Sequence, residues 1–140
     1  MSRLETVTEI AVRYAETDRM GVVHHSVYPV YFEVGRTDFF EQHLVHYDRM
    51  EQAGLMAPVI ELQLQVEGAA TYGDVLRLRT FPLWLKGVRL AMGYELHPRG
   101  SDVVLATGST THALLGPDRR PVHPRRFAEL YGKLKEVFGE

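Results

Sequence analysis

One short segment near the amino terminus carries the side chains best suited to chemistry. Residues 14–26 read Tyr-Ala-Glu-Thr-Asp-Arg-Met-Gly-Val-Val-His-His-Ser. Asp18 supplies a carboxylate, and His24 and His25 supply imidazoles, on either side of an apolar run at 20–23 where a surface loop would ordinarily carry Ser, Asn or Lys. A carboxylate beside an apolar patch can attack a carbonyl carbon or activate a water that does so.

A helix start directly follows this segment. Ser26 is a common N-cap residue type, and Pro29 fits a first turn, whose amides lack intrahelical partners. The sequence therefore predicts a helix that begins at about residues 25–27, with Ser26 as its cap. Backbone N–H groups at such a terminus can stabilise the negative charge that develops on a carbonyl oxygen during acyl transfer.

The flanking elements must position this segment. Alternation over residues 6–14 predicts a half-buried strand, so Tyr14 at its end is expected to point inward with Thr6, Thr8, Ile10 and Val12. After the segment, helical spacing of apolar residues predicts a long buried helix to about Tyr47. Its inner face comprises Tyr28, Phe32, Gly35 and Phe39, with Val27, Tyr31 and Val34 beside them.

The remaining chain predicts four consecutive strands and a second helix. Alternation is clearest at 59–67, and further strands are expected at 75–85, 88–96 and 103–115, separated by turns at 72–74, 86–87 and 98–102. Apolar residues at helical spacing follow Pro124. This order predicts an α+β fold in which a five-stranded, mostly antiparallel sheet packs against the long central helix.

Composition limits the class of protein. At 140 residues and 45% hydrophobic content, residues 1–140 are expected to form a single domain around one core. The chain has no cysteine, which excludes disulfides and thiolate chemistry, and its formal charge of −2 gives no general attraction to nucleic acid or anionic membranes. No signal peptide or membrane-spanning run is apparent, so we expect a cytoplasmic protein without membrane insertion.

Metal and nucleic-acid sites are not indicated. His43 and His46 share a helix face, but no converging third ligand accompanies them, so neither a metal nor a redox cofactor is expected. The basic pairs 119–120 and 125–126 lack interleaved aromatic residues and are typical of a solvated surface.

The sequence resembles a known family. Residues 14–33 are similar to the signature Tyr-x-(Glu/Asp)-Thr-Asp-x-x-Gly-Val-Val-(Tyr/His)-His-x-x-Tyr-x-x-(Tyr/Phe)-(Phe/Trp)-Glu of hotdog-fold acyl-CoA thioesterases of the 4-hydroxybenzoyl-CoA thioesterase type, most closely their Tol-Pal-associated branch. The similarity is specific over 14–36 and continues more loosely through 58–61, 72–75 and 106–112.

The resemblance implies a fold, an assembly and a set of roles. The sheet would wrap around the central helix, and protomers would pair by their sheet edges into a homodimer and then a homotetramer, with the active site at the dimer interface. Asp18 would be the catalytic carboxylate, as nucleophile or base, and the backbone N–H of His25 would bind the carbonyl oxygen. Tyr14 and the His25 side chain would support them.

The same resemblance suggests residues that bind the acyl-CoA substrate. Val23 and His24 would lie beside the acyl group, and Val59 and Ile60 would come from the neighbouring protomer. His24 replaces a tyrosine common in the family, which affects the shape of the acyl pocket rather than the chemistry. Lys86 and Arg89, near a strand connection, could meet the phosphates of coenzyme A.

Each candidate also has a structural interpretation. Asp18 could be a turn residue whose carboxylate binds nearby amides, His25 a helix cap, and Tyr14 a core aromatic residue. Glu33 is a second carboxylate, on the central helix, with a structural role expected.

Three functions remain open from the sequence. The first is hydrolysis of acyl-CoA to a carboxylic acid and free coenzyme A. The second is hydrolysis of thioesters on acyl carrier protein, which predicts a basic rim for an acidic partner. The third is a non-catalytic scaffold that binds acyl thioesters, which would not need Asp18 beside a helix terminus.

Overall fold

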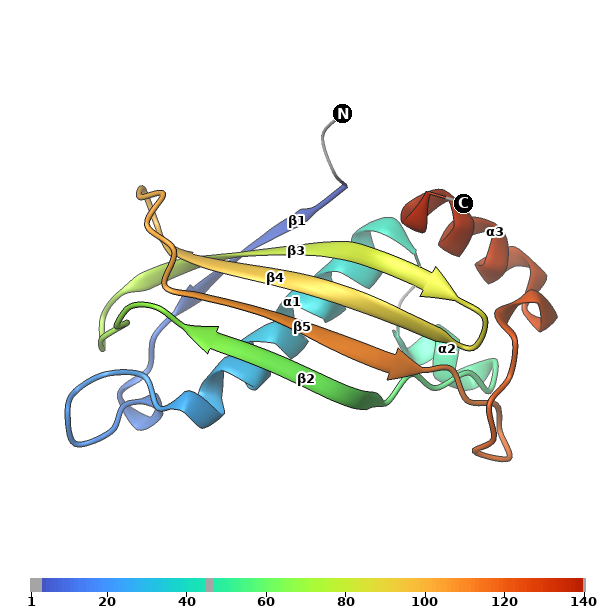
Figure 1. Ribbon diagram of the computed structural model, residues 1–140, viewed down its shortest axis with the longest axis horizontal. Coiled ribbons are helices and arrows are strands. Elements are labelled where there is room, and N and C mark those ends of the chain that lie inside the picture. The colour runs from blue at the N-terminus through green and yellow to red at the C-terminus, as the bar shows by residue number, and fades with distance from the viewer. Residues whose placement is uncertain (1–3, 45–46, 140) are drawn as a thin grey trace.

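The computed structural model describes residues 4–44 and 47–139 as a curved antiparallel sheet with helices on one side and at one end (Figure 1). The strands are β1 (Thr6–Ala11), β2 (Val59–Val66), β3 (Val75–Lys86), β4 (Arg89–Pro98) and β5 (Ala106–Ala113). The helices are α1 (Tyr28–His43), α2 (Tyr47–Gln52) and α3 (Ala128–Phe138), and three 3₁₀ turns occupy Tyr14–Glu16, His25–Val27 and Pro124–Arg126.

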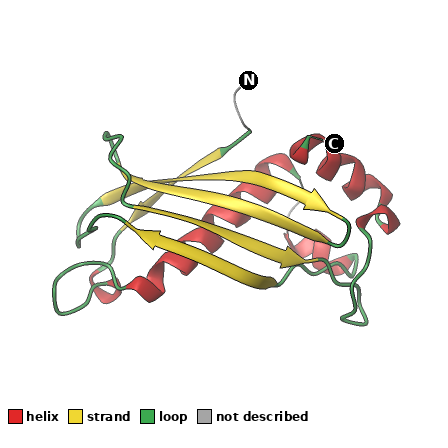
Figure 2. Cartoon of the chain, viewed as in Figure 1, coloured by secondary structure: helices red, strands yellow, loops and turns green. Residues whose placement is uncertain are grey.

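The strand order in the sheet is β1-β3-β4-β5-β2, and every neighbouring pair is antiparallel. Helix α1 crosses one face of this sheet, and α3 lies beside the end where the β3–β4 hairpin turns (Figure 2). The predicted fold class is therefore confirmed: a five-stranded antiparallel sheet wraps a long helix, with a further helix at the carboxyl terminus.

Close contact between α1 and the sheet organises the core. The buried face of α1 consists of Tyr28, Tyr31, Phe32, Gly35, Arg36, Phe39 and Phe40. A Cβ atom at Gly35 would clash with the Thr80 hydroxyl and the Leu78 side chain of β3, so only glycine permits this approach. Phe32 stacks on Tyr94 of β4 with ring centroids 4.3 Å apart. The predicted place of Gly35 on the inner face of the helix is confirmed.

The start and end of the central helix differ from the sequence prediction. His24 is the N-cap instead of Ser26, because its Nδ1 accepts from the Ser26 N–H at 3.1 Å and the chain turns helical at His25. Helix α1 ends at His43, where Leu44 leaves helical geometry and packs into the core. Residues 45 and 46 of the predicted extension lie outside the described residues, and α2 was not predicted.

Two strands are shorter than predicted. Strand β1 ends at Ala11 because the Val12 N–H leaves the β1–β3 ladder and donates to the Asp74 carbonyl, after which the chain forms a 3₁₀ turn. Strand β5 begins at Ala106 rather than Val103, whose carbonyl accepts from the His97 ring instead of joining the ladder. It ends at Ala113 rather than Leu115, which instead bridges Met56.

Different residues pack on the two faces of strand β4. Its inner face carries Leu90, Met92, Tyr94 and Leu96, all of them buried. On its outer face Gly93 lies directly opposite Phe81 of β3, and the Phe81 ring covers the position that a Cβ at residue 93 would take. An aromatic ring thus fills the space that the glycine leaves open.

Strand β2 forms an uncovered edge. Its apolar residues alternate as predicted, but Ile60, Leu62 and Val66 are 48%, 41% and 49% exposed. Helix α1 packs mainly against β1 and β3, at the other side of the sheet. Val34, expected beside the buried helix face, is likewise exposed. The alternation therefore marks a face that this chain alone does not bury.

Candidate functional site

Asp18 lies in a tight loop between the first 3₁₀ turn and the helix start. The loop is closed by a bridge between Thr17 and Val23 and by the Asp18 N–H, which donates to the Val22 carbonyl at 2.9 Å. Gly21 has a positive φ of 78°, which glycine adopts without strain. Asp18 Oδ1 accepts from the Met20 N–H at 2.8 Å, and the residue is exposed. The turn fixes the carboxylate without burying it.

The amide of His25 is available at the helix start. The His24 N–H donates to the Glu16 carbonyl and the Val27 N–H to the His24 carbonyl, while Ser26 is bound by the His24 ring. Within residues 4–44 and 47–139, no protein atom accepts from the His25 N–H. An unpaired amide at the first position of a helical segment is a geometry that binds an oxyanion. Asp18 and this amide occupy the two ends of one loop.

A hydrogen bond between the buried side chains of Glu16 and Tyr31 supports this loop from the core side. Tyr31 of α1 donates its hydroxyl to Glu16 Oε1 at 2.8 Å, and the Arg13 N–H donates to the same oxygen. Burial alone would raise the pKa of Glu16, but these hydrogen bonds outweigh it and hold the pKa below its usual value. Burial, with the neighbouring Glu16 carboxylate, raises the pKa of Tyr31. The brace was not predicted, because Glu16 looked like one polar residue of a loop.

Tyr14 does not point inward, so that prediction is wrong. Its side chain is 75% exposed and meets the Tyr72 ring edge to face at 5.7 Å. The strand ends three residues earlier than predicted, and the following 3₁₀ turn rotates the side chain away from the inner face. Tyr31 is the tyrosine that contacts the loop from within the core.

The imidazole rings of His24 and His25 lie side by side. Their ring centroids are 4.1 Å apart with a tilt of 31°, and both side chains are exposed. Within the described part of the chain, no group of three or more His, Cys, Asp or Glu residues could hold a metal ion. No described helix is both long enough and apolar enough to cross a bilayer.

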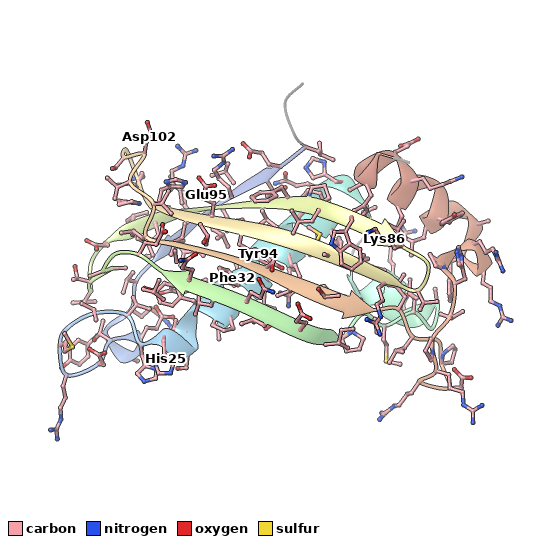
Figure 3. The ribbon with its side chains drawn as sticks, in the orientation of Figure 1. His25, Phe32, Lys86, Tyr94, Glu95 and Asp102 are labelled. Carbon is pink, nitrogen blue, oxygen red and sulfur yellow. The ribbon has the colours of Figure 1, made fainter. Side chains whose placement is uncertain are left out.

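The expected substrate-binding residues occupy three separate places. Val23 is buried behind the Asp18 loop, and its N–H donates to the Ala70 carbonyl. Val59 and Ile60 are exposed on the β2 edge. Lys86 and Arg89 face each other across the β3–β4 hairpin, and Lys86 lies at the end of the sheet remote from His25 (Figure 3). One chain thus brings His24, His25 and Val23 to Asp18, but not the others.

A large open cavity of the described structure lies away from Asp18 of the same chain. It has a volume of about 670 Å³ and separates the middle of α1 from the segment that leads into β2. Most of its lining is apolar, and Glu33 and Arg36 of α1 contribute charge. Its residues are Glu33, Arg36, Thr37, Met50, Leu55, Met56, Ala57, Pro58, Val59, Leu115 and Arg119.

A chain of buried polar side chains runs behind this cavity. Arg36 donates to the Tyr94 hydroxyl at 3.2 Å, Tyr94 contacts Thr110 Oγ1 at 2.7 Å, and Thr110 contacts His112 Nε2 at 2.8 Å. His112 Nδ1 lies 2.9 Å from the Ala57 carbonyl. Burial lowers the pKa of His112 to about 4, and the positive charge of Arg36 contributes. The sequence signal for this network is the polar pair Thr110 and His112, which alternate on the buried face of β5.

Comparison with known proteins identifies the family. Residues 12–136 match the model of the thioesterase-like superfamily, to which this chain belongs. The fold is accordingly the hotdog fold, and the protein is a thioester hydrolase. A relative in Bacillus subtilis (strain 168), named "Putative acyl-CoA thioesterase YneP", is 36% identical over 102 residues, which are 72% of this chain and 74% of the relative.

Solved structures agree with this assignment. The hypothetical protein TT1821 from Thermus thermophilus is 41% identical and superimposes with a TM-score of 0.86 over 96% of this chain and 98% of its own. The DHNA-CoA thioesterase from Staphylococcus aureus is 30% identical, with a TM-score of 0.85 over 95% of this chain and 92% of its own. About 95% of the chain therefore follows the architecture of these proteins.

The buried neutral His112 predicts that stability depends on pH. Because its pKa is about 4 in the folded protein and the ordinary value for histidine is 6.5, the unfolded chain binds more protons between these values. Folding stability should be fully present above pH 6.5 and fall by up to about 3 kcal/mol as pH decreases toward 4, at about 1.4 kcal/mol per pKa unit. Thermal melts of the wild type and His112→Asn over this range test it. An equal pH slope in both proteins would contradict it.

Proposed function

We propose that this protein hydrolyses acyl-CoA thioesters to a carboxylic acid and free coenzyme A. The observation that carries the proposal is the loop that holds the Asp18 carboxylate at one end and the unpaired His25 N–H at the other. A thioesterase requires one group to attack or activate water and another to bind the developing oxyanion. The relatives named as CoA thioesterases support coenzyme A as the thiol.

The reaction can follow either of two courses at this loop. As a base, Asp18 takes a proton from a water, whose oxygen attacks the carbonyl carbon while the His25 N–H binds the oxyanion. As a nucleophile, the Asp18 carboxylate forms a mixed anhydride that a water then hydrolyses. In both courses the carbon–sulfur bond breaks, and the thiolate of coenzyme A leaves and takes up a proton. The His25 ring supports the carboxylate or the water.

The active site is proposed to be shared by two chains. Strand β2 ends the sheet, and its exposed apolar residues need a cover that α1 does not supply. Antiparallel pairing of β2 with its copy about a twofold axis supplies it. In that pairing Val59 of one chain lies near the partner's Val66. Val66 leads to Ala70 and Thr71, which bind Val23 and Val22 of the Asp18 loop.

This pairing joins the separate parts of the site. The cavity begins at Val59, so in the dimer it faces the Asp18 loop of the partner. Lys86 and Arg89 lie at the same end of the sheet as Val59, because Arg89 pairs with Ala113 and Val59 with His112. They are proposed to meet the phosphates of coenzyme A, while Val59 and Ile60 contact the acyl group. Membership of the Tol-Pal-associated branch, a dimer of dimers and a cytoplasmic location stay predictions.

Acyl carrier protein is the alternative thiol carrier. The acidic surface of that protein would contact Lys86 and Arg89, the same residues proposed to bind coenzyme A. Only a measurement of hydrolysis can therefore distinguish the two carriers. Hydrolysis of one acyl group on coenzyme A and on acyl carrier protein should favour coenzyme A. A graded series of aliphatic acyl-CoAs, with benzoyl and phenylacetyl esters, would then define the acyl group. Binding without turnover on every ester would indicate the non-catalytic scaffold.

Asp18→Asn should abolish hydrolysis while the fold and substrate binding remain. The change removes the carboxylate at nearly constant size, and its amide oxygen can still accept from the Met20 N–H. We expect kcat to fall at least about 100-fold, the usual contribution of general-base catalysis. Asp74→Asn is the matched control, because Asp74 also binds a backbone amide of its own turn, that of Thr71. Retention of more than about a tenth of the rate would reject the assignment.

Two substitutions at His25 separate its amide from its ring. His25→Ala keeps the N–H and should cost less than about tenfold, whereas His25→Pro removes it and should cost about 100- to 1,000-fold in kcat. Proline suits this position, since it is the first of the helical segment and His24 before it has a ψ of 142°. Melting temperatures control for folding. Equal losses in both variants would show that the amide is not the oxyanion donor.

Complementation between inactive chains tests the shared site. Chains with Asp18→Asn lack the carboxylate, and chains with Val59→Trp should have a blocked cavity. A mixed dimer then contains one site with an intact Asp18 and an intact Val59, so mixing should restore about half of the activity per mixed dimer. No restoration, in mixtures shown by mass to contain mixed dimers, would place each site within one chain.

The dimer itself is tested by sedimentation at the assay concentration. Leu62→Glu on the β2 edge should give inactive monomers, because a charge replaces an apolar residue at the proposed interface. Leu83→Glu is the control, since Leu83 has a similar exposure of 45% on β3. A fully active monomer would refute both the shared site and the edge pairing.

A further inference from the structure

The buried polar chain behind the cavity has one possible direction of donation. The Ala57 carbonyl can only accept, so His112 must carry its proton on Nδ1 and leave Nε2 as an acceptor. Thr110 then donates its hydroxyl to Nε2, and Tyr94 donates its hydroxyl to Thr110 Oγ1. The Arg36 guanidinium can only donate, and it donates to the Tyr94 oxygen. The donor or acceptor role of each group is thus determined by its neighbour in the series.

The environment holds this order in place. Tyr94, Thr110 and His112 are each at most 1% exposed, and Arg36 is 8% exposed. Buried polar groups that lose a partner are costly, since no water replaces the lost bond. Phe32, stacked on Tyr94, fixes the ring from the side of α1. Few alternative positions are therefore open to the four side chains.

The hydrogen-bonded series of side chains links two opposite walls of the cavity. Arg36 lies on α1, which forms one wall, and Ala57 lies in the segment before β2, which forms the other. That segment has backbone bonds of its own: Met56 and Leu115 exchange two hydrogen bonds, and the Ala113 N–H donates to the Pro58 carbonyl at 3.2 Å. The bond from His112 ties it to the core and, through Thr110 and Tyr94, to the opposite wall.

We propose that His112 is a positioning residue that fixes the width of the acyl pocket by holding the carbonyl of Ala57. This inference rests on the proposed function, in which the cavity receives the acyl group. His112 itself contacts no reacting atom. It acts through the wall formed by Leu55, Met56 and Ala57, and it therefore sets which acyl groups fit, with the chemistry left to Asp18 and the His25 amide.

Two isosteric substitutions divide the bonds of His112. The amide nitrogen of asparagine can take the place of Nδ1, so His112→Asn keeps the donor to Ala57 and loses the acceptor for Thr110. Glutamine reaches the place of Nε2, so His112→Gln keeps the acceptor for Thr110 and loses the donor to Ala57. Both variants lose one buried bond and are expected to lose similar stability. Only His112→Gln releases the Ala57 carbonyl, and with it the cavity wall before β2.

The expected result is a change in substrate selection by one variant alone. For the preferred acyl-CoA, His112→Gln should raise KM about tenfold or more and flatten the dependence on acyl size, while kcat changes less than about threefold. His112→Asn should stay within about threefold of the wild type in both constants. Equal KM changes in the two variants, or none in either, would overturn the proposal.

Hydrogen exchange separates failure of this inference from failure of the proposed function. The Ala113 N–H donates to the freed segment, so it should exchange about tenfold faster in His112→Gln than in His112→Asn at matched global stability. This measurement needs no turnover. Equal exchange in the two variants would overturn the positioning role. If the wild type hydrolyses no thioester, the proposed function and the pocket role fail, whatever the exchange shows.

Discussion

The close approach of α1 to β3 is the constraint on which the rest of the structure depends. Because residue 35 is glycine, the helix backbone rests against Leu78 and Thr80 with no side chain between them. This contact fixes the distance of the helix from the sheet and therefore places its first turn. The loop before that turn is held by Tyr31 through Glu16. A helix displaced outward by one methyl group would carry the brace, and with it Asp18 and the His25 amide, out of register.

The same placement of α1 separates the Asp18 loop from the cavity within one chain. The helix covers β1 and β3, so the inner face of β2 remains open and the cavity lies at the open side. Asp18 is not among the residues that line this cavity. In the proposed dimer, a twofold axis at the β2 edge would bring the Asp18 loop of one chain to the cavity of the other. If this pairing forms, hydrolysis depends on assembly through one edge of the sheet, a relation that no single residue of the loop reveals.

The sequence predicted the features that rest on local chemistry and regular spacing. The order of elements, the Asp18 turn and the helical segment from His25 all depend on neighbouring residues. The direction of Tyr14 was wrong because alternation shows a strand but not the residue at which pairing stops. Ser26 was a reasonable cap by residue type, yet the ring of His24 accepts from the Ser26 N–H. The chain from Arg36 to His112 joins three elements, so no local pattern could reveal its partners.

The contact between Phe81 and Gly93 has a consequence for how this sheet can change over time. A methyl group at residue 93 would collide first with the Phe81 ring, to which its three nearest atoms all belong. Alanine at 93 is therefore obstructed while phenylalanine is present, and a smaller residue at 81 removes the obstruction but leaves an open hollow on the sheet. The effect of either substitution depends on the other, a case of pairwise non-additivity. In related chains the two positions should vary as a pair, with the ring shrinking before the glycine gains a side chain.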